Sequence, residues 1–455
     1  MSRAKNVDVL NGSLLSSIIK FGIPLLFVSL MQSLFHSIDI MVLGQMADNE
    51  AVAAVSATGS VVSLLTTVSM GISVGAKIVL ARLIGEGVGQ KIERTVFTSM
   101  ATAVILGAVT MIVGISFAPM FLSITKCPES IIYDSQIYMQ IYFVAAPAIM
   151  IYNFGSNILQ VSGDSQRPLY YMMISGGLNI VLNFLLCLVL TQKVTAVAIA
   201  TAVSQIVGAV LVSRRILTMD GACRLKLKDG RWDWRSFKLL LTNGLPIGFS
   251  SALYSLANLQ IQTALNSFGP QAIAGNSGSA NIEGIQNSIA NAPWSATVGV
   301  FVGQNVGAGN KKRVRNSILT CMAISVSIGL VMGITSYLLS RPLLSMFVDG
   351  EVALGYGRIR MGYLVLFCAV SCLSAQFSNS IQAFGYSLFC TINSIVCVFG
   401  FRMLWMNNVY PLCPTFHVLI QCFLISWILV CFFNGLFFFY LYFARFKKGK
   451  IKKMG

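Results

Sequence analysis

The sequence predicts an all-α membrane protein of twelve transmembrane helices, arranged as two pseudo-symmetric six-helix bundles. Three observations lead to this fold class. The 455 residues are 56% hydrophobic and only 10% charged, whereas soluble proteins carry about 25% charged residues. The apolar residues gather in runs long enough to cross a bilayer. Short motifs of the first half of the chain return in the second half at one constant offset.

The apolar runs number twelve, and several exceed the roughly 20 residues that a bilayer requires. Helix tilt or extension into water accommodates the excess length. The runs are expected near residues 15–45, 51–78, 95–119, 135–160, 168–190, 194–216, 237–266, 273–303, 316–339, 358–384, 388–410 and 416–443.

The internal repeat has an offset of 222 residues. The tetrad that ends at Pro24 returns as the one that ends at Pro246, and Gln160-x-x-Gly163 returns as Gln382-x-x-Gly385. Each proline fits either a first-turn position or a helix kink. With six spans per half, both halves enter the membrane from the same side, as parallel repeats. We therefore expect an N-lobe over 1–213, a cytoplasmic linker over 214–238, and a C-lobe with a basic tail over 239–455.

The net charge of +17 reflects membrane orientation rather than nucleic-acid binding, because the cations lie between the apolar runs. With the N-terminus inside, most of the 32 Lys and Arg residues fall in inward loops, above all in the linker. Both termini are thus expected to be cytoplasmic, in the cell (inner) membrane. Lys77 and Arg402 fall within spans, and the outer loops would hold only Lys126, Lys193, Arg341, Arg358 and Arg360.

Several kinds of chemistry have no basis in the sequence. The eleven Cys are scattered singly without a CxxC motif, and there are only two His, so no metal site or cofactor is expected. The sequence contains no HExxH, and its GxSxG match, Gly71-Ile72-Ser73-Val74-Gly75, lies inside an apolar run rather than at the strand-to-helix turn that a nucleophile elbow requires. We do not expect an enzyme.

The first apolar run carries an acid deep in apolar sequence, Asp39. Ser29, Gln32 and His36 precede it at spacings that place all four on one helix face. A carboxylate at mid-bilayer costs roughly 2.5–3.5 kcal/mol, so it needs a partner or a proton. The face is either a polar seam between helices or an ion or proton site of a transporter.

The fifth and sixth runs supply further polar groups. Asn179 and Asn183 form one stripe with Ser175, and the sixth run contains Thr201. Amide and hydroxyl oxygens suit a proton network or Na⁺, although interhelical hydrogen bonding explains them equally well.

The second half has its own acid, Glu283, in a stripe with Asn287. It would either contact a cationic substrate or end a helix near the outer interface. The other candidate substrate-binding residues are Gln32, Tyr254, Asn258, Asn153 and Asn157.

Together and in order, several motifs make the chain resemble the multidrug and toxic compound extrusion (MATE) transporters over about residues 10–445. They include Gly163-Asp164-(x)₃-Pro168, Leu178-Asn179-(x)₃-Asn183, Asn281-Ile282-Glu283 and Val302-Gly303-Gln304-Asn305. The resemblance implies cation-coupled export, by alternating access, of organic, often cationic or lipophilic, drugs. It implies a partner set of small molecules and the lipid bilayer, and we expect a monomer that binds no nucleic acid.

The bacterial DinF-type branch of that family is the one that the chain resembles most. Carried over, its cation site comprises Asp39, Asn179, Asn183 and Thr201, with His36 beside it. The branch usually has Asp at the position of Asn183, which puts the coupling ion in doubt. One carboxylate compensates Na⁺ poorly, so H⁺ is favoured and Na⁺ is the alternative. A lipid-linked oligosaccharide flippase of the related superfamily is a second alternative, weakened by the few intramembrane cations.

The predicted topology is testable by cysteine labelling. In a cysteine-free background, a membrane-impermeant maleimide should label Arg358→Cys in intact cells, and Arg224→Cys only after permeabilisation. Labelling of both variants from the same side would contradict the topology.

Overall fold

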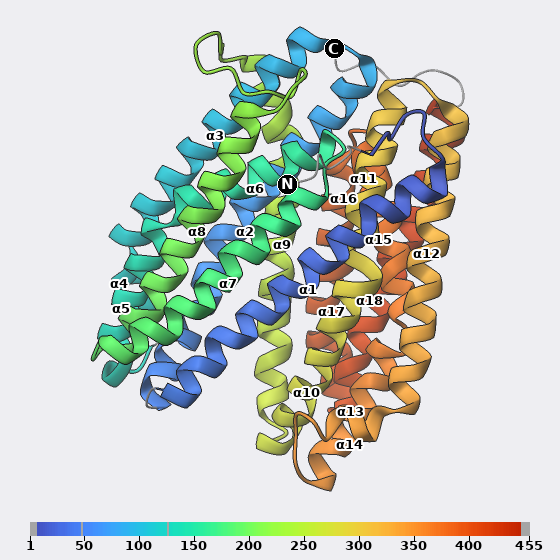
Figure 1. The fold of residues 1–455 in the computed structure, drawn as a ribbon. Coiled ribbons are helices and arrows are strands. Elements are labelled where there is room, and N and C mark those ends of the chain that lie inside the picture. The colour runs from blue at the N-terminus through green and yellow to red at the C-terminus, as the bar shows by residue number, and fades with distance from the viewer. Residues whose placement is uncertain (1–6, 47–48, 125–126, 447–455) are drawn as a thin grey trace. The chain divides into compact units, whose positions relative to one another are not determined.

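The computed structural model describes residues 7–46, 49–124 and 127–446, except for the side chains of 36–41, 43–50, 52, 60, 64 and 445. Its described residues form helices and no strand (Figure 1). In the first half the helices are α1 (Leu14–Met46), α2 (Asn49–Glu86), α3 (Gly89–Ser116), α4 (Ala118–Ile124), α5 (Glu129–Val144), α6 (Ala146–Val161), α7 (Gln166–Val189) and α8 (Lys193–Thr218).

The second half is also helical but includes π-helical segments. Its α-helices are α9 (Trp234–Asn266), α10 (Pro270–Gln286), α11 (Ala292–Gly307), α12 (Lys311–Leu338), α13 (Ser340–Leu344), α14 (Glu351–Arg360), α15 (Cys368–Ala383), α16 (Ser387–Ser394), α17 (Phe401–Leu404) and α18 (Phe416–Tyr440). The π segments are η1 (Asn287–Asn291), η2 (Met361–Val365), η3 (Ile395–Gly400), η4 (Trp405–Val409) and η6 (Leu441–Phe446), and η5 (Tyr410–Leu412) is a short 3₁₀ turn.

The chain is a multi-pass membrane protein, as the sequence predicts. Within the described residues, ten helices are long and apolar enough to cross a membrane, and the α5–α6 pair, bent by 45°, adds an eleventh if counted as one span. The predicted run 273–303 is not among them: it folds as α10, η1 and α11, and its many amide and small polar residues make it less apolar than the other runs.

The internal repeat is visible in the backbone. Gly87 and Gly309, which follow α2 and α11, have φ of 72° and 69°. Gly163 and Gly385, which follow α6 and α15, have φ of 88° and 85°. Both pairs are 222 residues apart, and a positive φ favours glycine over any other residue. The turns of the two halves therefore have the same conformation at equivalent positions.

The chain divides into two compact units. The N-unit contains Val7 and Met31–Gly248, and the C-unit contains Asp8–Leu30 and the chain from Phe249 onward. The predicted lobe boundaries differ from these units at two helices, since the first half of α1 belongs to the C-unit and the first half of α9 to the N-unit. Each of these helices continues without a break from one unit into the other.

Glycine allows the first half of α9 to pack in the N-unit. A Cβ on Gly71 of α2 would lie 2.3 Å from the backbone nitrogen of Gly248, and one on Gly75 would lie 2.4 Å from the carbonyl oxygen of Leu240. The two backbones therefore touch with no side chain between them, as small residues allow in membrane helices.

The first half of α1 packs in the C-unit in the equivalent place. The rings of Phe21 and Phe301 lie edge to face with centroids 5.7 Å apart. A Cβ on Gly22 would come within 2.7 Å of the ring of Trp294. In the repeat, α11 corresponds to the second half of α2. The first half of α1 therefore packs on α11 in the C-unit just as the first half of α9 packs on α2 in the N-unit.

Pro24 and Pro246 lie well inside α1 and α9. The first-turn interpretation of these prolines is therefore wrong. An interior proline has no N–H to donate to the carbonyl four residues earlier, so both helices lack one backbone hydrogen bond near the point where they pass between units.

The glycine contact of α2 with α9 is testable. Gly71→Ala should lower the apparent melting temperature in detergent, because the added methyl group overpacks the crossing at a cost of about 1–3 kcal/mol. Gly59→Ala is the matched control in the same helix, since a Cβ there meets no heavy atom within 4 Å. Equal shifts for the two variants would contradict this account.

Candidate functional site

The N-unit contains a cavity of about 460 Å³ between α1, α2, α5, α6, α7 and α8. Its wall carries no charge among the described residues: it combines hydroxyl groups of Ser, Thr and Tyr and amides with apolar side chains such as Phe35, Val62 and Met70. The predicted residues that line it are Gln32, Asn153, Asn179 and Thr201. A neutral wall of this kind presents both hydrogen-bond donors and acceptors to a small ligand.

Three of the predicted coupling residues form one hydrogen-bonded chain. Asn183 Nδ2 donates to Asn179 Oδ1 at 3.3 Å, and Asn179 Nδ2 donates to Thr201 Oγ1 at 3.4 Å. All three are buried, with exposed fractions of 0%, 6% and 9%. The four-residue spacing on α7 places the two amides on one face, toward Thr201 of α8. The structure therefore brings together residues that the sequence separates by about twenty positions.

The other predicted residues of the first half have different surroundings. Asn153 Nδ2 donates to the carbonyl of Ile149 in its own helix, at 2.9 Å. Asn157 Nδ2 donates to Ser73 Oγ at 3.1 Å and does not line the cavity. The side chains of His36 and Asp39 lie outside the described residues.

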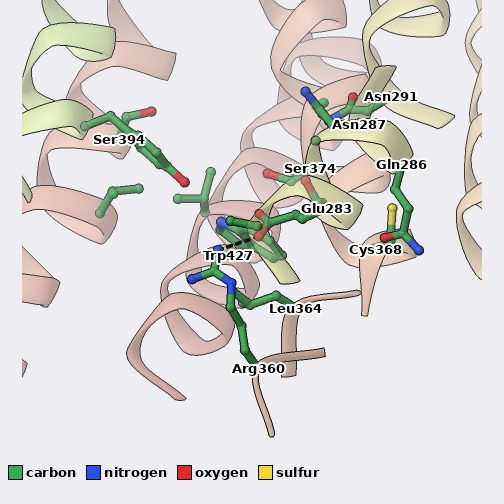
Figure 2. A pocket seen from close by; sticks show the side chains of 17 residues that line it. Glu283, Gln286, Asn287, Asn291, Arg360, Leu364, Cys368, Ser374, Ser394 and Trp427 are labelled. Carbon is green, nitrogen blue, oxygen red and sulfur yellow. Dashed lines mark hydrogen bonds and ion pairs between the residues drawn. The ribbon is translucent and has the colours of Figure 1, made fainter. Parts of the chain in front are cut away.

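The C-unit contains a second cavity, of about 470 Å³ (Figure 2). Tyr254, Glu283 and Asn287 line it, as do Arg360 and Trp427. Residues of the π-helical segments η1, η2 and η3 contribute to the wall, and π segments occur frequently at functional sites. Asn258 does not line this cavity. Of the predicted substrate-binding residues, two thus line the N-unit cavity, three line the C-unit cavity, and Asn157 and Asn258 line neither.

Pro293 accounts for the irregular backbone at η1. It has no N–H for the carbonyl of Ile289, and the indole Nε1 of Trp294 donates to that carbonyl instead, at 3.1 Å. The next carbonyl, of Ala290, accepts from Ser325 Oγ at 2.6 Å. These donors satisfy backbone groups that the π segment exposes, as the membrane interior requires.

Glu283 is paired with a cation. Arg360 Nη2 donates to Glu283 Oε2 at 2.6 Å, and Arg360 Nη1 donates to Asn276 Oδ1 at 2.8 Å (Figure 2). The expected place of Arg360 in an outer loop is wrong: it is the last residue of α14 and is only 8% exposed. Its aliphatic stem and long reach let a residue near the start of an apolar run place its charge inside the unit.

Arg402 is a second buried cation of the C-unit. It is fully buried, and its guanidinium donates to Asn258 Oδ1 at 2.7 Å and to Ser426 Oγ at 3.0 and 3.1 Å. It lies over the rings of Phe423 and Tyr254, at 4.4 and 4.9 Å from the centroids. Among the described residues, no carboxylate lies within ion-pair distance of it.

Sequence reasoning missed Arg360 and the contacts of Arg402. The signal was present, because Arg360 begins one apolar run and Glu283 lies inside another. Opposite charges in two apolar runs stabilise each other when they meet, since each alone carries a large desolvation cost.

A family model described as MatE matches residues 24–185 and 246–405, more than half of the chain. The two matched segments begin at Pro24 and Pro246, so the model matches once in each half of the repeat.

Individual relatives and solved structures match over most of the chain. "Probable multidrug resistance protein YoeA" of Bacillus subtilis is 27% identical over 84% of this chain and 83% of its own. "FAD transporter" of Shewanella oneidensis is 24% identical over 70% of this chain and 71% of its own. A crystal structure of "MATE in the bent conformation" has a TM-score of 0.89, with 20% identity over 99% of this chain and 100% of the other. The structural match shows a shared fold.

Proposed function

The chain belongs to the MATE family of membrane transporters, and from that premise we propose that it is a proton-coupled antiporter that exports drug-like compounds. Relatives named for multidrug resistance cover more than four fifths of the chain and support export of small organic molecules. Transport would proceed by alternating access, and the chain is not an enzyme.

The observation that carries the coupling proposal is the buried chain of Asn183, Asn179 and Thr201 beside a cavity without a described charge. The only acid in the predicted membrane core of the first half is Asp39, four residues after the cavity-lining Phe35 on the same helix. A single carboxylate among neutral amides and hydroxyls suits one proton better than Na⁺, whose charge it would compensate poorly in a site of low dielectric.

The mechanism rests on two states of Asp39. Protonation removes the cost of holding a charge in the membrane and changes the hydrogen bonds that the carboxyl group can make. Two protonation states that favour different arrangements of α1 would couple proton binding to substrate release. Deprotonation toward the cytoplasm would then return the carrier to its starting state.

The cellular location, the oligomeric state and the family branch of the chain are also proposals. The charge asymmetry of the loops supports a place in the cell membrane with both termini in the cytoplasm, and a monomer of two six-helix lobes is the simplest arrangement. Membership of the DinF-type branch is also a proposal: it is based on the motif resemblance, and the relatives above carry other names. The names include both drug export and FAD transport, so the family by itself leaves the charge of the substrate open.

Asp39→Asn tests the coupling. In proteoliposomes, ΔpH-driven efflux of ethidium should fall to the level of empty liposomes, because the amide cannot exchange a proton. Ethidium binding and the melting temperature should stay near wild type. Wild-type rates of ΔpH-driven efflux in Asp39→Asn would exclude the mechanism.

Asn183→Asp tests why H⁺ and not Na⁺ is used. A second carboxylate beside Asn179 and Thr201 would better compensate a sodium ion, so ΔNa⁺ imposed without ΔpH should drive efflux in this variant and not in wild type. Sodium-driven efflux by the wild-type protein would show that the Na⁺ alternative is correct.

A further inference from the structure

The membrane part of the C-unit carries an excess of positive charge. Arg360 and Arg402 are both buried, and Glu283 is the one described carboxylate paired with either of them. Arginine stays protonated in proteins, so one positive charge is compensated only by the amide of Asn258, the hydroxyl of Ser426 and two aromatic faces. Arg402 does not line the cavity, so the cation that a ligand in the cavity could meet is Arg360.

Arg360 has a donor that no group of the described residues accepts from. Its side chain is 9% exposed, and its Nε is buried without a hydrogen-bond partner. An unsatisfied buried donor costs about 1–3 kcal/mol. The guanidinium belongs to the cavity wall and points toward Glu283 in Figure 2. A small shift of the side chain that exposed Nε to an acceptor oxygen in the cavity would remove this cost.

The rest of the wall suits an amphiphile. Trp427 and Tyr254 offer aromatic surface, while Asn287, Asn291 and Ser374 offer neutral polar groups. The arrangement combines one charged anchor with apolar and amide surroundings, which is typical of small-molecule sites.

We propose that the C-unit cavity binds an amphiphilic substrate through its oxyanion, a carboxylate or phosphate group held by Arg360. The planar guanidinium presents a fork of donors that matches two oxygens of such a group. The proposal deepens the export function proposed above by naming the substrate class.

A cationic substrate fits this geometry less well. Glu283 already accepts from Arg360 at 2.6 Å, so a cation would have to compete with a permanent internal cation. An oxyanion would instead displace Glu283 from Arg360, or would accept hydrogen bonds from Arg360 alongside Glu283. The two substrate classes therefore predict opposite effects when Glu283 is neutralised.

The test compares three probes that differ in charge: N-dansylglycine, its uncharged amide, and cationic dansyl-ethylenediamine. Equilibrium binding is measured by fluorescence on the full chain in phosphatidylcholine nanodiscs. Wild type should bind the acid about tenfold tighter than the amide, the difference expected for a charge-assisted hydrogen bond. Glu283→Gln should strengthen binding of the acid and leave that of the amide unchanged, because the internal competitor for Arg360 is gone.

Two further variants separate binding from folding. Glu283→Gln/Arg360→Gln replaces the ion pair by two neutral amides, leaves no unpaired charge, and should bind acid and amide equally. Arg341→Gln is the matched control, because Arg341 forms an exposed ion pair with Glu351 outside the cavity, and it should preserve the preference. Melting temperatures identify any variant that is unfolded.

Equal binding of the acid and the amide by wild type, or weaker binding of the acid by Glu283→Gln, would overturn the proposal. Failure of all three probes to bind would overturn it as well. These equilibria do not depend on coupling, so ΔpH-driven ethidium efflux without an acid preference would exclude the oxyanion site alone. An acid preference with ΔpH-driven efflux of neither ethidium nor N-dansylglycine would instead exclude the coupling mechanism.

Discussion

The constraint on which this structure depends is that the membrane interior offers no water to buried polar groups. Where Pro293 interrupts the backbone pattern, the indole of Trp294 and the hydroxyl of Ser325 donate to the carbonyls of Ile289 and Ala290. In the N-unit, buried amides satisfy each other and Thr201. These groups therefore take their hydrogen-bond partners from within the protein, and the cavities lie beside them.

The two halves share one scaffold but carry different charges. Counted back by the repeat offset, Glu283, Arg360 and Arg402 correspond to Val61, Tyr138 and Ile180 in the first half, and Asp39 corresponds to Ile261 in the second. Charge thus occurs in each half where the other half is apolar or aromatic. This difference supports a division of labour, with coupling in one unit and substrate recognition in the other.

The sequence predicted the helical membrane fold and the repeat because hydropathy and constant spacing follow directly from residue order. Helical periodicity also predicted that Asn179 and Asn183 share one face, and the MATE resemblance grouped them with Thr201. It could not predict the pairing of Arg360 with Glu283, because a long side chain at a span boundary can turn either outward or inward. Nor could it predict the exchanged helix halves. They rest on contacts between distant segments, such as that of Gly71 with Gly248 for α9 and that of Gly22 with Trp294 for α1.

The exchange of helix halves bears on how such a chain arises by gene duplication. A single ancestral repeat could not have completed its own unit, because the first half of its first helix would belong with a second copy. Such an ancestor would have been an obligate swapped dimer, and fusion of two copies would have turned an intermolecular exchange into an intramolecular one. Its monomer would have left the glycine-bearing face of α2 uncovered. On this account, duplication would have preserved an interface that already existed, and the halves would have acquired different charges only after fusion.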